Sequence, residues 1–424
     1  MITGVQGMIA SHLRSPLDSS KMNIRAEAPT AGLCSARVLP SWPSFGPDEI
    51  EAVRAVLESG RVNYWTGEEG RRFEEEYASS LGVAHAIGLA NGTVALELPL
   101  RMWGIAPGDE VIVTPRSFIA SASCVALLGA RPVFVDVDAD SQNITANTIV
   151  RALTPRTRAI VAVHLAGWPC EMDPIMALAK ERGIKVLEDC AQAHGATYRG
   201  RPVGSFGDAA AFSFCQDKII TTGGEGGLLA TNDEGLWRAA WAFKDHGKSW
   251  EAVHEREHAP GFRWLHESIG TNWRLTEMQA AIGRSQLRKL QDWVEARHRN
   301  AATLRSILSS CSAIRIPDPP RHSGHAYYRF YLFVRPDALK AGWSRDRILA
   351  EVRSAGVPCS AGSCSEIYRE AAFKGIDIGL EAPLLTAREL GETSLALLVH
   401  PTLEHADVLH VAAVITSVLA RSAR

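Results

Sequence analysis

The chain has little of what marks a membrane, secreted or nucleic-acid-binding protein. No apolar run reaches the length of a membrane-spanning helix, about 20 residues. The N-terminal region contains no unbroken apolar segment of the kind that forms the core of a signal peptide. Lys and Arg number 45 against 47 Asp and Glu, with no block of basic residues. We therefore expect a cytoplasmic protein that binds neither membranes nor nucleic acids.

Paired cysteines are also missing. The eight cysteines are scattered, without the CxxC spacing of zinc sites and redox pairs, and the closest two are Cys359 and Cys364. This pattern indicates reduced structural thiols rather than a disulfide framework or a metal site.

What the sequence does contain is a regular alternation of apolar and amphipathic segments. At 424 residues the chain is long enough for two domains. Strands are predicted at 84–90, 111–115, 132–138, 158–167, 184–189, 209–214 and 228–231. Strands that are apolar throughout and joined by helices form a parallel sheet covered on both faces. The predicted class is therefore α/β, with ligands bound beyond the carboxyl ends of the strands.

A helix is predicted just after residue 47, where the globular part begins. Asp48 is the expected N-cap, and Gly60 the expected end. Apolar residues at helical spacing, including Ile50, Val56 and Leu57, predict one buried face.

The stretch from Asp208 to Asp233 predicts a strand, a glycine-rich turn and a second strand. Lys218 stands just before this turn. A lysine at the edge of an apolar strand has two interpretations. It is either a surface lysine that closes a hairpin, or a buried amine whose pKa falls so that it can attack a carbonyl group.

Residues of chemical interest follow other predicted strands. Asn91, Gly92 and Thr93 open a helix, where free backbone amides either bind a phosphate or are simply capped. Phe118 is either a core residue or a stacking surface. Asp189 either caps a helix or faces a protonated ring nitrogen.

These residues fit one site. It would contain a phosphate cup, a stacking ring, an acid for a ring nitrogen and a lysine for an aldehyde, supplied by Gly92, Thr93, Ser213, Phe118, Asp189 and Lys218. That combination is how proteins hold pyridoxal 5'-phosphate (PLP). In a chain with nine lysines, its occurrence at the strand ends of one sheet argues against coincidence.

Longer stretches carry a family resemblance. The chain resembles the DegT/DnrJ/EryC1/StrS family of PLP-dependent sugar aminotransferases almost continuously from residue 45 to 290. The matching stretches are FEEEYASSLG, ANGTVAL, PGDEVIVTP, SFIASA, GARPVFVDVD, EDCAQAHGATYRGRPVGSFGDAAAFSFCQDK, TTGGEGGLLATND, HGK and GTNWRLTEMQAAIGRSQL.

The resemblance implies a fold-type I aminotransferase that works as a homodimer. Its large PLP-binding domain, with a mostly parallel seven-stranded sheet, would span residues 41–290. A smaller C-terminal α/β domain would span 291–424. Residues 1–40 have no match and are expected to form an arm, flexible or extended.

The resemblance also implies roles at the cofactor. Lys218 would bind the aldehyde carbon and act as the catalytic base. Asp189 would pair with the ring nitrogen, Gln192 would lie on the side of the ring hydroxyl, and Phe118 would stack on the ring.

The phosphate contacts implied by the resemblance involve two chains. Gly92, Thr93 and Ser213 would hold the phosphate from one subunit. Asn272 matches the asparagine that reaches the neighbouring subunit's phosphate, so the active sites would be shared across the dimer.

Three departures from the family pattern stand out. Asp217 places a negative charge next to Lys218 and could raise the pKa of its imine. Arg116 could meet an anionic substrate. Pro99 lies inside the helix that begins the phosphate cup and would kink it.

The expected function is transamination from glutamate or glutamine to a keto-sugar, nucleotide-linked, in amino-sugar or surface polysaccharide (lipopolysaccharide) biosynthesis. A cyclitol or free keto-sugar acid is the alternative acceptor. A sugar dehydratase is less favoured because Lys218 is present, and a non-catalytic PLP-binding protein is the other alternative. The glycine-rich turn does not fit a dehydrogenase, because it lies between strands rather than between a strand and a helix.

Other residues receive structural interpretations. His194 is expected behind the site as a hydrogen-bonded group rather than a catalyst. Tyr327, Tyr328 and Tyr331 are expected mainly in the core, with one at the substrate mouth. Trp65 is either a hydrophobic anchor or a surface for the acceptor.

Overall fold

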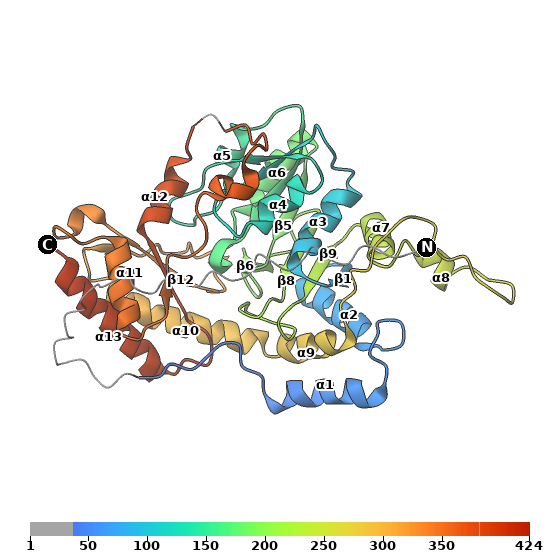
Figure 1. Cartoon of the computed structure of the whole chain (residues 1–424), viewed down its shortest axis with the longest axis horizontal. Coiled ribbons are helices and arrows are strands. Elements are labelled where there is room, and N and C mark those ends of the chain that lie inside the picture. Colours follow the sequence, from blue (N-terminus) through green and yellow to red (C-terminus); the bar gives the residue numbers. More distant parts are fainter. Residues whose placement is uncertain (1–36, 381) are drawn as a thin grey trace, which may run out of the picture. The chain divides into compact units, whose positions relative to one another are not determined.

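The computed structural model describes residues 37–380 and 382–424; the predicted arm lies outside the described residues except for its last four. The central element is a seven-stranded sheet (Figure 1). In sheet order its strands are β1 (His85–Leu89), β9 (Gly227–Thr231), β8 (Ala209–Ser213), β5 (Lys185–Asp189), β4 (Thr157–Val163), β2 (Glu110–Val113) and β3 (Arg131–Phe134).

Six of these strands run in one direction. Strand β9 pairs antiparallel with both β1 and β8, so β1 and β8 are parallel to each other. Strands β8, β5, β4, β2 and β3 pair in parallel along the rest of the sheet. The carboxyl ends of β1, β8, β5 and β2 therefore meet at one edge, which confirms the predicted mostly parallel sheet.

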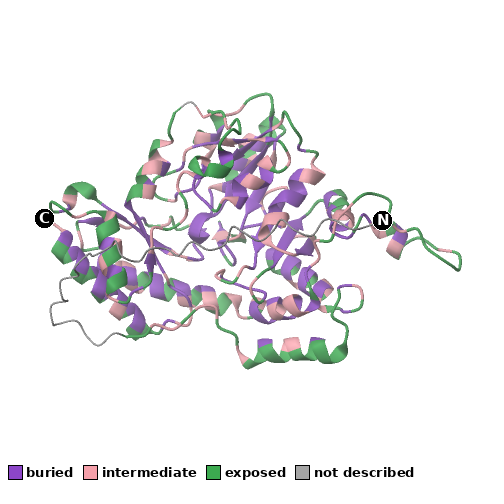
Figure 2. Cartoon of the chain, in the orientation of Figure 1, coloured by how far each residue is buried: buried purple, intermediate pink, exposed green. Residues whose placement is uncertain are grey.

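Both faces of the sheet are buried (Figure 2). Along β4, Ile160 and Ala162 enter one hydrophobic core, whereas Val161 and Val163 enter the other. The first core is completed by α2 (Glu69–Leu81), α6 (Met172–Arg182) and α9 (Glu277–Leu287), and the second by α3 (Gly92–Met102), α4 (Ala120–Ala126) and α7 (Glu234–Lys244). This two-sided burial explains why the strands read as continuous apolar runs.

The described helices flank the sheets. They are α1 (Pro47–Ser59), α2 (Glu69–Leu81), α3 (Gly92–Met102), α4 (Ala120–Ala126), α5 (Ala146–Val150), α6 (Met172–Arg182), α7 (Glu234–Lys244), α8 (Trp250–His254), α9 (Glu277–Leu287), α10 (Leu290–Leu308), α11 (Arg345–Ser354), α12 (Leu385–Thr393) and α13 (His405–Ser422). Among the described helices, none has both the length and the apolarity that crossing a bilayer demands.

A third core lies in the C-terminal part of the chain. There β10 (Ile314–Arg315), β12 (Phe330–Val334), β14 (Ser394–Leu397) and β13 (Cys359–Ser360) form a four-stranded antiparallel sheet. Helices α10, α11 and α13 pack around the core of this sheet. A short three-stranded sheet joins β11 (Ser323–Gly324), β6 (Thr197–Tyr198) and β7 (Arg201–Pro202).

Helix α1 differs from its prediction at its start. Its N-cap is Gly46, whose N–H donates to Glu49 Oε2 at 2.8 Å, and Asp48 instead pairs with Lys289. The predicted end at Gly60 is confirmed by a φ of 66°. The predicted buried face is only partly correct, because α1 packs on α9 along one narrow side and leaves Ile50 and Leu57 exposed.

Candidate active site

The sheet brings the predicted residues to one edge. Asn91 follows β1, Phe118 follows β2, Asp189 ends β5, and Ser213 ends β8. Lys218 lies in the turn that leaves β8, and its backbone carbonyl accepts a hydrogen bond from the Trp42 indole at 2.9 Å.

The N-terminus of α3 forms a cradle with β8. Asn91 caps the helix by accepting from the N–H of Val94 at 3.1 Å, so the first-turn amides of Gly92 and Thr93 have no helical partner. A Cβ on Gly92 would lie 2.6 Å from Ser213 Cβ and 3.0 Å from Ser213 Oγ. The absence of a side chain at Gly92 thus lets two free amides and a hydroxyl converge, which suits a phosphate.

Pro99 does not interrupt this arrangement. It lies inside α3, which continues from Gly92 to Met102. The amide that proline lacks is in the second half of the helix, away from the cradle.

Asp189 is a buried carboxylate held from two sides. Its Oδ2 accepts from Ser121 Oγ at 2.7 Å, and its Oδ1 accepts from the N–H of Ala191 at 3.1 Å. Burial raises the pKa of Asp189, while these two hydrogen bonds and the charge of Lys218 act in the opposite direction. A buried acid of this kind gains most from a positively charged partner.

A second hydroxyl stands behind Ser121. Ser117 Oγ lies 2.9 Å from Ser121 Oγ. Ser121 gives its one hydrogen to the carboxylate, so Ser117 must donate to Ser121.

Lys218 is mostly buried and close to an acid. Its Nζ lies 3.6 Å from Asp217 Oδ1, and its side chain is 15% exposed. The surface interpretation of Lys218 is therefore wrong.

Gln192 and Phe118 take different positions. Gln192 is buried, and its Oε1 accepts from the N–H of Ala166 at 2.8 Å, which leaves the Nε2 hydrogens for a ligand. Phe118 is 66% exposed at the strand edge, so the core interpretation of this residue is wrong. Asn272 is exposed and forms a β-bridge with Asp245.

His194 lies behind the site, as predicted. Its Nε2 lies 2.9 Å from the carbonyl oxygen of Ser213, and its Nδ1 lies 2.7 Å from the hydroxyl of Tyr77. Burial lowers the pKa of His194 to about 4. The neutral ring therefore donates to Ser213, accepts from Tyr77 and fixes the end of β8.

The prediction that Arg116 could meet an anionic substrate is wrong. Arg116 is fully buried, and its guanidinium donates to Gln142 at 2.8 Å and to Ser394 at 3.0 Å. It links the end of β2 to the start of β14 and is not available to an anionic substrate.

Trp65 is a packing residue. Its ring makes edge contacts with Tyr64 and Trp241, and Lys248 Nζ lies 4.1 Å from its centroid. These contacts favour the anchor interpretation.

A buried cluster one residue from Asp189 is structural. His164, Glu188 and Cys190 bring possible metal ligands together. However, Glu188 accepts from His164 and from backbone amides in residues 204–207, and His164 Nδ1 accepts from the N–H of Cys170. These bonds occupy the imidazole and carboxylate atoms that a metal would need.

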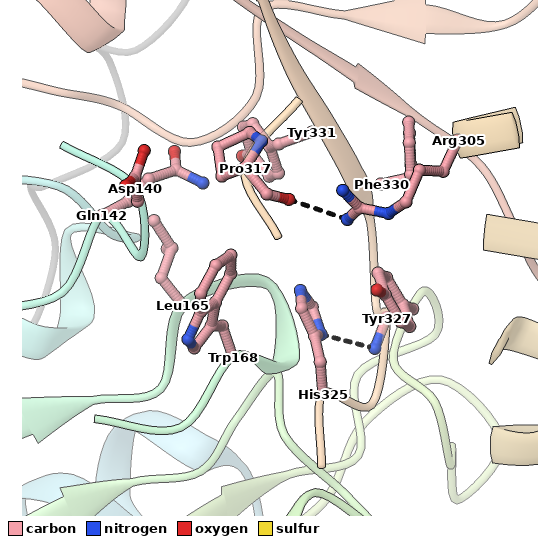
Figure 3. A pocket seen from close by; sticks show the side chains of 10 residues that line it. All are labelled: Asp140, Gln142, Leu165, Trp168, Arg305, Pro317, His325, Tyr327, Phe330 and Tyr331. Atoms are coloured by element: carbon pink, nitrogen blue, oxygen red, sulfur yellow. Dashed lines mark hydrogen bonds between the residues drawn. The ribbon is translucent and has the colours of Figure 1, made fainter. Parts of the chain in front are cut away.

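A small cavity lies elsewhere (Figure 3). It measures about 20 Å³ and is lined by residues that include Trp168, Arg305, His325 and Tyr331. That volume suits about one water molecule and is far too small for a sugar. Among the described residues, none of the predicted site residues lines this cavity.

The arrangement at the sheet edge fits PLP. The cradle suits a phosphate, Asp189 suits a protonated ring nitrogen, and Lys218 suits an aldehyde. Comparison with known proteins agrees: the model of the DegT/DnrJ/EryC1/StrS aminotransferase family matches residues 43–416. The chain belongs to this family.

Two similar proteins are named for UDP- and GDP-linked sugars. The chain is 40% identical to UDP-N-acetyl-3-dehydro-alpha-D-glucosamine 3-aminotransferase of Acidithiobacillus ferrooxidans, over 73% of this chain and 80% of that protein. It is 37% identical to GDP-perosamine synthase of Escherichia coli O157:H7, over 69% of this chain and 77% of that protein.

A solved structure agrees in fold. The aminotransferase from Psychrobacter cryohalolentis is 53% identical, with a TM-score of 0.89, over 90% of this chain and 99% of that one. The predicted family, fold type, PLP dependence and sugar aminotransferase activity are confirmed.

Sequence reasoning missed several residues around the site. Ser121 could have been found, because it stands four residues after Ser117 at the start of a helix. Trp42 and Arg329 gave no signal, and Tyr328 was expected mainly as a core residue, because the contacts of all three with residues 217 and 218 span more than 100 positions.

Proposed function

We propose that this enzyme moves an amino group from glutamate or glutamine to a ketone carbon of a nucleotide-linked sugar. The observation that carries this proposal is Lys218, a mostly buried amine at the same sheet edge as Asp189 and the phosphate cradle. The named relatives act on UDP- and GDP-linked sugars, which supports a nucleotide-linked acceptor. We also place the enzyme in the cytoplasm, in line with the free thiols of the described residues.

In this proposal Gly92, Thr93 and Ser213 bind the cofactor phosphate, and Phe118 covers one face of its ring. PLP, when bound, would supply the electron sink that makes the donor's α-proton removable. Asp189, as a carboxylate, would keep the ring nitrogen protonated. The free amine of Lys218 would take the α-proton as a base and return it as an acid.

We further propose a homodimer with shared sites. Asn272 is exposed, as a residue that serves a neighbouring subunit would be in one chain. Phe262, Trp264 and Ile269 are 78%, 79% and 91% exposed in the segment just before it. Large apolar groups exposed together often mark a protein interface.

The test is the visible absorption of the purified protein before and after glutamate or glutamine. We expect a yellow band that bleaches with a donor and returns with a nucleotide-linked keto-sugar. Lys218→Ala should bind PLP without this cycle. Asp189→Ala should lower kcat more than it weakens PLP binding, because its charge acts mainly in the transition state. A band that no amino acid bleaches would contradict the proposal.

A further inference from the structure

Asp217 connects Lys218 to two residues far away in the sequence. Its Oδ1 lies 3.6 Å from Lys218 Nζ. Its Oδ2 accepts a short hydrogen bond from the Tyr328 hydroxyl and a second bond, at 3.2 Å, from Arg329 Nη2. Lys218 Nζ also lies 5.0 Å from the centroid of the Tyr328 ring. We call Asp217, Tyr328 and Arg329 the Asp217 network.

The local backbone makes this contact possible. In a strand, neighbouring side chains point to opposite faces. Asp217 and Lys218 lie instead in a turn after β8, where the N–H of Lys218 donates to the carbonyl of Cys215 at 3.0 Å. The turn lets the side chains of both residues reach Tyr328.

Within this network, Asp217 carries a negative charge. Burial alone would raise the pKa of Asp217, but Lys218, Tyr328 and Arg329 lower it below its ordinary value. Burial raises the pKa of Tyr328, so its hydroxyl remains a neutral donor. Asp217 is therefore an ionised carboxylate shared between one amine and two donors.

We propose that Asp217, oriented by Tyr328 and Arg329, is the positioning residue for Lys218. It holds the lysine amine by charge attraction whenever that amine is not bound to the cofactor. The positive charge of Arg329, which donates to Asp217 Oδ2 at 3.2 Å, acts against this attraction. This inference rests on the proposed function, in which Lys218 must leave the cofactor and return a proton.

The other titratable groups that face Lys218 act differently. Asp189 is a second negative charge whose own pKa Lys218 influences. His194, also influenced by Lys218, is neutral because burial lowers its pKa to about 4. Neither group contacts Asp217 through a hydrogen bond among those of the described residues, so variants of the Asp217 network change one charge at a time.

The first experiment needs no cofactor. The apoprotein is labelled with trace acetic anhydride across a range of pH, and acetylation of the peptide that contains Lys218 is measured by mass spectrometry. Only the uncharged amine reacts. Asp217→Asn should lower the midpoint of Lys218 labelling by about 1 pH unit, since an opposite charge at this distance favours the charged amine. Arg329→Gln should raise that midpoint.

The second experiment uses the holoenzyme. The pH midpoint of the cofactor's visible absorption change should move in the same directions in the same variants. Asp346→Asn is the matched control, because Asp346 pairs with Arg345 at 2.7 Å on an exposed surface. Its midpoints should equal those of the wild type.

Opposite shifts for Asp217→Asn and Arg329→Gln support the proposal. Unchanged midpoints, or shifts of Asp217→Asn and Arg329→Gln in the same direction, would overturn it, and a change in melting temperature alone would indicate a merely structural pair. If Asp217→Asn fails to fold, Tyr328→Phe replaces it and should raise the midpoint as Arg329→Gln does, because Asp217 then loses a competing donor; an unchanged or lower midpoint in Tyr328→Phe would overturn the proposal. A wild type without a visible band would contradict the proposed function, whereas the labelling would still decide the role of Asp217.

Discussion

The bond from Ser121 to Asp189 shows how one hydroxyl can set the charge of an active-site acid. A buried carboxylate with a raised pKa needs donors to remain ionised, and Ser121 supplies one at 2.7 Å. Ser121→Ala should therefore raise the pKa of Asp189 further. We expect the rate of the donor half-reaction to fall about tenfold, since a hydrogen bond to a charged group contributes about 1.5–3 kcal/mol.

Stopped-flow absorbance measures that half-reaction. Ser123→Ala is the matched control, because Ser123 lies on the same helix, is less buried and makes none of the contacts with Asp189. An unchanged rate and pH profile in Ser121→Ala would show that the hydroxyl does not tune Asp189.

His194 makes the stability of the protein depend on pH. Its pKa is about 4 in the folded chain and about 6.5 when unfolded, so the unfolded chain takes up the proton first. The stabilising effect of the neutral ring is complete above about pH 6.5 and is lost as the pH falls toward 4, in total about 3 kcal/mol. His194→Gln should flatten this part of the curve.

Melting temperature measured from pH 7.5 to 4.5 checks the prediction. The exposed His405→Gln serves as the control and should follow the wild type. A His194→Gln curve with the wild-type slope would mean that other groups cause the loss.

At the scale of elements, the close approach of α3 to β8 determines the phosphate cradle. Gly92→Ala places a Cβ 2.6 Å from Ser213 Cβ, so the helix must move away from the strand. We expect weaker PLP binding and a loss of about 1–3 kcal/mol in stability, as for other overpacked sites. Without the clash, alanine would stabilise a helix.

Fluorescence titration with PLP and thermal melting measure both effects. Gly235→Ala on α7 is the control, because its Cβ meets nothing closer than 3.3 Å. Normal PLP affinity in Gly92→Ala would exclude the cradle as the phosphate site.

The elements also show what a sequence can predict. All seven strands of the large sheet were expected within a few residues, because two-sided burial makes them continuously apolar. The buried face of α1 was predicted less well, since periodicity in a sequence cannot reveal that only a narrow side meets α9. The Asp217 network was not predictable, because it depends on a turn that aligns Asp217 with Tyr328.

At the scale of the whole molecule, the exposed aromatic pair Phe262 and Trp264 is expected to lie in the dimer interface. Their rings contact each other at a centroid distance of 5.1 Å, so they present one apolar surface. The double variant Phe262→Ser, Trp264→Ser should shift sedimentation from dimer toward monomer. It should also weaken PLP binding if Asn272 serves the partner's site.

Analytical ultracentrifugation at several concentrations measures that shift. Leu385→Ser is the control, because Leu385 is 71% exposed in a different part of the chain. A double variant that remains dimeric would place the interface elsewhere.

The position of β9 has a kinetic consequence. Strand β9 joins β1 to β8, and its Gly227 lies so close to Asn91 that a Cβ there would be 2.2 Å from the Asn91 carbonyl oxygen. The pairing of Leu89 with Gly227 closes a very long loop, and such contacts form slowly. We therefore expect the cofactor site to be completed late in folding. During refolding with PLP present, the yellow colour should appear after the far-ultraviolet circular dichroism has recovered.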